Sequence, residues 1–113
     1  MIFGIPVKTN GENPAIAPTF GKVKFFAIVN GDEVKIIENV EKSGMKAVQL
    51  LLQNGVDTLL MSHIGGRPLE MALQSGIDVR FVGKDRMTIS EAVSRFADFP
   101  KATEIDSDLF TSH

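Results

Sequence analysis

One histidine stands in a segment whose neighbours could bind a ligand. His63 follows the short apolar run Thr58–Met61 and precedes Gly65, Gly66 and Pro68. The run is too short for a helix and is bounded by turn signals, so it predicts a buried strand. The two glycines predict a tight turn with positive φ, and Pro68 suits the first turn of a helix. An imidazole between a strand end and a helix N-terminus could contact an anion or serve as a metal ligand.

The apolar pattern predicts an α/β domain with its elements in the order βββαβαβα. The expected strands are Ile2–Val7, Phe25–Val29, Glu33–Ile37, Thr58–Met61 and Ile77–Val82. The expected helices begin after Ser43, near Pro68 and after Thr88. The Asn30-Gly31 pair predicts a type I′ hairpin turn, and Thr88 with Glu91 predicts a capping box.

These elements predict a ribonuclease H-like three-layer fold with three helices. Its sheet is expected to be five-stranded and mixed, in the order 3-2-1-4-5, with strand 2 antiparallel. We expect one domain over residues 1–100 and a polar C-terminal tail over residues 101–113. In this order the chain leaves strands 1 and 4 in opposite directions, which opens a crevice beyond their carboxyl ends.

Three connections are expected to meet at this crevice: residues 8–21, 62–67 and 83–87. The first is long for a loop without secondary structure, which is typical of functional loops. Together they carry basic side chains close to the start of the second helix. The residues are Lys8, Lys22, Arg67, Lys84 and Arg86. The predicted ligand is therefore an anion.

Composition excludes several classes of site. The 113 residues carry a net charge of −2 and include no cysteine, tryptophan or tyrosine. Thiolate nucleophiles and clusters assembled on cysteine are therefore excluded. The charge and the missing aromatic residues disfavour nucleic acid as a partner, and no apolar run is long enough to span a membrane. No signal peptide is evident, so we expect a cytoplasmic protein.

The sequence predicts no catalytic centre. Asp57 and Asp78 open their strands and are expected at the sheet edge opposite the crevice. Ser62 and His63 are adjacent on an extended segment, so their side chains point apart and do not form a catalytic pair. We therefore expect a binding protein that is not an enzyme.

Three short motifs resemble one known family. They are Pro18-Thr19-Phe20-Gly21-Lys22, Gly44-Met45-Lys46-Ala47 and Ser62-His63-Ile64-Gly65-Gly66. With the strands around them, they resemble the dinitrogenase iron–molybdenum cofactor biosynthesis domain from Ile2 to Phe96. That family has a ribonuclease H-like fold, and its nitrogen-fixation members bind or carry the iron–molybdenum cofactor or its precursor.

The resemblance implies a non-catalytic carrier of an anionic iron–molybdenum or iron–sulfur cluster, with a cofactor-maturation protein as a partner. It implies His63 as the metal ligand. The other cofactor-binding residues that it implies are Thr19, Phe20, Gly21, Lys22, Gly65, Gly66 and Arg67. Cofactor-binding members commonly have a histidine where this chain has Thr19, and often an arginine where it has Lys22. The alternative is an anion- or metabolite-binding interaction module that has lost the metal cofactor.

Overall fold

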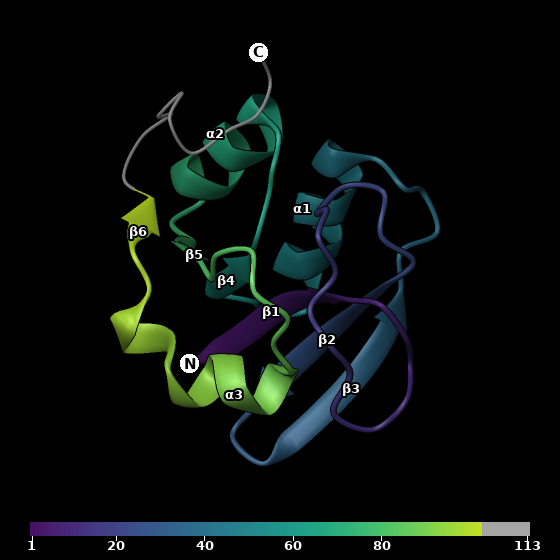
Figure 1. Cartoon of the computed structure of the whole chain (residues 1–113). Helices are drawn as coiled ribbons and strands as arrows, with labels where there is room; N and C mark the ends of the chain where they lie inside the picture. Colours follow the sequence, from purple (N-terminus) through teal and green to yellow (C-terminus); the bar gives the residue numbers. More distant parts are fainter. Residues whose placement is uncertain (103–113) are drawn as a thin grey trace.

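Six strands form one mixed sheet in the order β3-β2-β1-β4-β5-β6 (Figure 1). The structure is a computed structural model, and it describes residues 1–102. The strands are β1 (Ile2–Val7), β2 (Phe25–Asn30), β3 (Glu33–Glu38), β4 (Thr58–Met61), β5 (Asp78–Phe81) and β6 (Lys101–Ala102). β4 runs parallel to both β1 and β5, whereas β2 is antiparallel to β1 and β3. The predicted α/β class and the predicted order of the first five strands are confirmed.

The predicted count of five strands is wrong, because β6 adds a short antiparallel strand beside β5. Its two residues are too few to show the alternation by which a strand is recognised in a sequence. Ala102 is buried and Lys101 is exposed, and the amide of Phe81 donates to the carbonyl of Pro100 at 3.1 Å. Of the predicted C-terminal tail, residues 103–113 lie outside the described residues.

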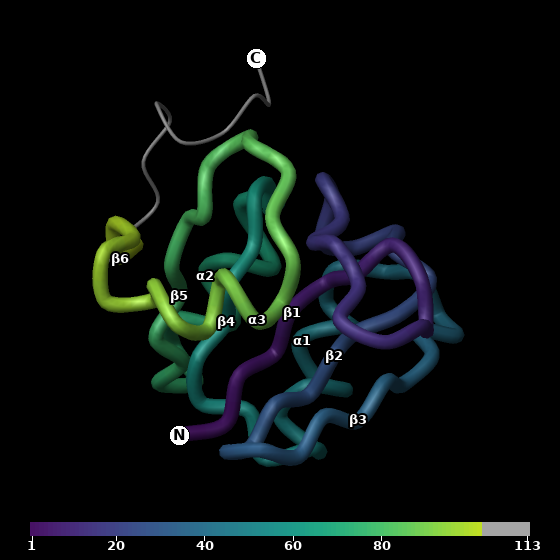
Figure 2. Tube along the Cα trace, turned by 60° about the horizontal axis from the view of Figure 1, so that its bottom comes forward, coloured from purple at the N-terminus to yellow at the C-terminus, as the bar shows by residue number. Residues whose placement is uncertain are grey.

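Helices cover both faces of the sheet, which gives three layers (Figures 1 and 2). α1 (Gly44–Gln53) and α2 (Gly66–Gln74) pack on one face, where their buried side chains join those of the sheet in one apolar cluster. α3 (Ile89–Ser94) and the short 3-10 helix η1 (Phe96–Asp98) lie over the other face, with a second cluster beneath them. None of the helices in the described part of the chain is both long and apolar enough to cross a membrane.

Local sequence signals explain most of the boundaries. Thr88 and Glu91 form the predicted capping box of α3. Ser43 holds the N-cap position of α1, but its side chain forms no capping hydrogen bond. In the β2–β3 hairpin the turn residues are Gly31 and Asp32, and only Gly31 has positive φ. This is the pattern of a type II′ turn, so the predicted type I′ turn is wrong.

Candidate functional site

β1 and β4 lie side by side at the centre of the sheet, and the chain leaves them in opposite directions. From β1 it continues to β2, and from β4 it continues to β5 on the other side. Loops that leave the carboxyl ends of such a pair cannot cover one another, so a crevice opens between them. The carboxyl end of β1 and β4 is therefore the topological switch point that the sequence predicts.

A pocket of about 450 Å³ opens at this switch point. All three loops expected at this edge contribute to its lining. The lining residues are Lys8, Ile16 and Pro18 after β1, Ser62 and His63 after β4, and Lys84, Asp85 and Arg86 after β5. The structure thus brings together side chains that lie up to 78 positions apart (86 − 8 = 78) in the sequence.

The pocket carries an excess of positive charge. Lys8, Lys84 and Arg86 are exposed at its rim, and Asp85 is the one carboxylate that lines it. Within residues 1–102 the one ion pair joins Asp78 to Arg80 at 3.2 Å, so the rim cations form none there. Three basic side chains that form no ion pair with another described residue favour an anionic ligand.

His63 lies half-buried in the pocket wall. Within the described part of the chain its imidazole forms no hydrogen bond and no ion pair, so both ring nitrogens are free of protein partners there. A neutral imidazole can donate through one nitrogen and bind a metal through the other. His63 is therefore available to a ligand.

Of the motif Pro18-Thr19-Phe20-Gly21-Lys22, the pocket lining includes Pro18 but not Phe20. Phe20 is 1% exposed and packs against Phe26 in the core, with ring centroids 5.3 Å apart. A Cβ on Gly21 would lie 3.0 Å from the backbone of Gly44, and a Cβ on Gly44 would overlap the ring of Pro68. Gly21, Gly44 and Pro68 thus form a close stack that joins this loop to the starts of α1 and α2.

The other implied binding residues lie outside the pocket lining. Thr19, Lys22 and Arg67 are exposed. Gly65 is the extended N-cap of α2 and Gly66 is its first residue, and neither has positive φ, so the expected left-handed turn is wrong. A Cβ on Gly66 would meet no atom within 4 Å, and no side chain caps α2. A role for these residues in binding stays a prediction.

Sequence reasoning missed Asn39, which is 1% exposed. Its side-chain amide donates to the carbonyl of Gly21 at 3.1 Å and to that of Val23 at 2.8 Å. Its backbone amide donates to the carbonyl of Lys24 at 2.7 Å. Asn39 therefore fixes the segment behind the Phe20 loop. It lies in a polar stretch between β3 and α1, where an asparagine normally indicates only a turn.

The protein does not build a chelating metal site within residues 1–102. No three histidine, aspartate or glutamate side chains come together there, and the whole chain has no cysteine. The switch-point pocket offers one imidazole together with three cations and one carboxylate.

Comparison with protein families identifies the family of this chain. The family described as dinitrogenase iron-molybdenum cofactor matches residues 1–98. The chain belongs to this family. An uncharacterized protein from Methanocaldococcus jannaschii is 33% identical to it over 78 residues. That alignment covers 60% of this chain and 66% of the relative, just under two thirds of the relative's length.

Solved structures of similar proteins have the same fold. The apo form of the orange protein from Desulfovibrio gigas is 25% identical, with a TM-score of 0.81 over 93% of this chain and 95% of that one. A candidate NifB protein from Thermotoga is 23% identical, with a TM-score of 0.75 over 93% of this chain and 96% of that one. These similarities extend across almost the whole described domain.

Proposed function

We propose that this protein is a non-catalytic carrier that holds a preassembled, anionic metal–sulfur cluster in the switch-point pocket. The observation that carries the proposal is the set of three basic side chains around one free imidazole: Lys8, Lys84 and Arg86 around His63. Each of the three loops contributes at least one of them. A negatively charged cargo would neutralise side chains that have no counter-ion within residues 1–102.

The donor set fits a preassembled cluster better than a bare metal ion. One imidazole does not make a metal site, because a divalent ion needs several ligands in a defined geometry. A cluster that brings its own sulfide ligands needs only charge neutralisation, hydrogen bonds and one nitrogen. His63 would supply that nitrogen, and the cations would supply the neutralisation.

The start of α2 would extend the binding surface. The first N–H groups of a helix point outward and favour negative charge. Gly66 leaves open space at this terminus and Arg67 is exposed beside it. We include Gly65, Gly66 and Arg67 in the proposed site, with Thr19, Gly21 and Lys22 on the neighbouring loop. Phe20 would act as the core anchor of that loop.

Similarity to a known apo protein supports a carrier role. An apo form is by definition the unloaded state of a protein, and the orange protein has been solved in that form. A carrier must receive and release its cargo, so a cofactor-maturation protein is the expected partner. The exposure of Lys8, Lys84 and Arg86 would let a partner reach the bound cluster.

Anaerobic titration with tetrathiomolybdate tests this proposal, because that dianion combines molybdenum, sulfide ligands and negative charge. We expect saturable binding by absorbance. Lys84→Ala and Arg86→Ala should each weaken it about threefold to tenfold, as the loss of one screened charge contact of roughly 1 kcal/mol implies. His63→Ala should also weaken it. Lys35→Ala, on the distant edge strand β3, is the matched control. Absence of binding, or an equal loss in Lys35→Ala, would refute the proposal.

The alternative is an anion- or metabolite-binding interaction module without a metal. One observation favours it: the pocket has three cations but a single nitrogen ligand. It predicts that the protein binds inorganic phosphate or a nucleotide. The affinity for that ligand should depend on Arg86 and Arg67, but not on the ability of His63 to bind a metal. Phosphate binding with wild-type affinity in His63→Gln, together with no binding of tetrathiomolybdate, would establish the alternative.

A further inference from the structure

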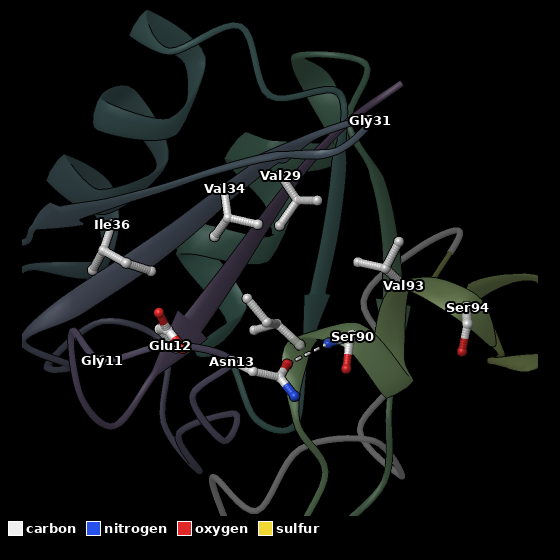
Figure 3. Close-up of a pocket in the computed structure, with 11 residues that line it drawn as sticks. Gly11, Glu12, Asn13, Val29, Gly31, Val34, Ile36, Ser90, Val93 and Ser94 are labelled. Atoms are coloured by element: carbon white, nitrogen blue, oxygen red, sulfur yellow. Dashed lines mark hydrogen bonds between the residues drawn. The ribbon is translucent and has the colours of Figure 1, made fainter.

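A second pocket, of about 590 Å³, lies on the α3 face of the sheet, away from the switch point (Figure 3). Val29, Val34 and Ile36 of β2 and β3 line one side of it, and Ile89 and Val93 of α3 line another. Figure 3 shows the side chains of Val29, Val34 and Val93 pointing into the same hollow. None of its lining residues belongs to the switch-point pocket.

Within residues 1–102 the helix layer on this face is incomplete. α3 has six residues and packs against β1, and no helix of this part of the chain lies over the same face of β2 and β3. Val34 is consequently 52% exposed, although it alternates with charged residues as a core-facing residue would. Ile36 and Val93 are half-buried, and Val29 and Ile89 are buried. An exposed aliphatic side chain in a concave, mainly apolar site is typical of a surface that binds a ligand.

The opposite wall is the part of the β1–β2 loop that forms hydrogen bonds with α3. Asn13 adopts φ +44°, and its side-chain oxygen accepts a hydrogen bond from the amide of Ser90 at 3.0 Å. The amide of Ile89 donates to the carbonyl of Pro14 at 3.0 Å. Figure 3 shows the Asn13–Ser90 bond between the loop and α3. These bonds hold Gly11, Glu12 and Asn13 across from the valines.

Glu12 gives the pocket its charge. It is the one charged residue that lines the pocket, and it forms no ion pair within residues 1–102. The remaining polar groups are partly engaged, since the Ser94 hydroxyl donates to the carbonyl of Glu91 at 2.9 Å. An aliphatic pocket with a single carboxylate at its rim is complementary to an apolar body that ends in a cation.

We propose that this pocket binds a small amphiphile with an aliphatic or aromatic body and a protonated amine. The body would cover Val29, Val34 and Ile36, and the ammonium would pair with Glu12. A pocket of about 590 Å³ lies within the range of roughly 300–1,000 Å³ usual for small-molecule sites. The site shares no lining residue with the switch-point pocket, and it takes a cation where the switch-point pocket takes an anion.

Titration of the full-length protein with octylammonium, followed by methyl NMR, tests the proposal. Octanoate and octanol serve as probes with the same chain length and a different head group. We expect saturable shifts of the Val29, Val34, Ile36 and Val93 methyls, with octylammonium bound at least threefold more tightly than octanoate. Val34→Asp should reduce the affinity for octanol, whereas Val40→Asp, at an exposed valine outside the pocket, should not.

Glu12→Gln separates the two parts of the proposal. This variant should remove the preference for octylammonium and retain the affinity for octanol. Equal binding of octylammonium and octanoate to the wild type would overturn the role of Glu12. No saturable shift with any of the three probes would overturn the pocket as a small-molecule site. Methyl shifts that depend on protein concentration alone would overturn it in favour of a second copy of the chain.

Discussion

Glycine and proline residues fix the spacing between the two helices on one face of the sheet. Gly44 and Gly66 are each the first residue of a helix, and neither has positive φ. Their surroundings differ, because a Cβ on Gly44 would overlap Pro68 whereas a Cβ on Gly66 would meet open space. One position requires glycine for packing, and the other tolerates a side chain.

Substitution of these glycines by alanine should therefore have opposite effects. We expect Gly44→Ala to lower the free energy of unfolding by about 1–3 kcal/mol, the usual cost of overpacking. Gly66→Ala should raise it by up to about 1 kcal/mol, because alanine restricts the unfolded chain and favours the helix. Urea denaturation measures both values. Equal destabilisation by the two variants would contradict the packing role of Gly44.

Asn39 offers a second test at a single residue. Asn39→Ala removes both of its side-chain hydrogen bonds and should cost about 2 kcal/mol of unfolding free energy. Asn39→Asp should cost more at pH 7, because a carboxylate would face two carbonyl oxygens. That repulsion raises the pKa of the new carboxyl in the folded state above its unfolded value, so the neutral acid is favoured.

The stability difference between Asn39→Asp and the wild type should consequently narrow as the pH falls from about 7 to about 4, because the folded variant then takes up a proton more readily than the unfolded chain. Chemical denaturation at several pH values measures this difference. For Asn39→Ala the difference should stay constant over the same range. If the difference in unfolding free energy between Asn39→Asp and the wild type did not depend on pH, the carbonyls of Gly21 and Val23 would have moved away from the new carboxylate.

Single residues were predictable from the sequence only where their position in the chain decides their role. His63 lies two residues after the end of β4, and loops that follow strand ends at a switch point line the crevice. Phe20 and Gly21 lie in a loop, and nothing in the sequence decides whether a loop side chain turns toward solvent or toward the core. The resemblance of their motif implied that they lie with His63 in the cofactor-binding site, but the structure shows that Phe20 is part of the core.

The elements themselves were more predictable, because apolar periodicity and cap residues determine them locally. The strand order followed from the alternation of strands and helices, since each parallel crossover has one favoured hand. β6 was not predicted, because Lys101–Ala102 has no local strand pattern. These residues form a strand only because they pair with β5.

The sixth strand can be tested by two adjacent substitutions. Ala102 is 2% exposed and lies in the core cluster beneath α1 and α2, whereas Lys101 is exposed. Ala102→Asp should lower the unfolding free energy by more than about 2 kcal/mol, because it buries a carboxylate without a partner. Lys101→Asp should change it by less than about 0.5 kcal/mol, as surface substitutions usually do. Thermal unfolding followed by circular dichroism compares them.

At the scale of the whole molecule, ion pairs contribute little to folding, whereas three basic side chains gather at one pocket. The net charge is −2, and the described residues contain one ion pair. The melting temperature of the unliganded protein should therefore change little between about 0.05 and 0.5 M NaCl. Binding of tetrathiomolybdate should weaken markedly over the same range, because added salt shortens the distance over which the exposed rim cations attract an anion, to about 10 Å at 0.1 M and less at higher concentration. Salt-independent binding would show that the anion is held without the rim cations.

The β1–β2 loop contributes to both pockets, with Lys8, Ile16 and Pro18 in one and Gly11, Glu12 and Asn13 in the other. A ligand in either pocket would restrict the conformational freedom of this one segment. The second ligand would then lose less entropy on binding, which produces positive cooperativity without any change in the average structure. Such coupling is reciprocal. If the bound amine raises the affinity for the anion by a given factor, the bound anion must raise the affinity for the amine by the same factor.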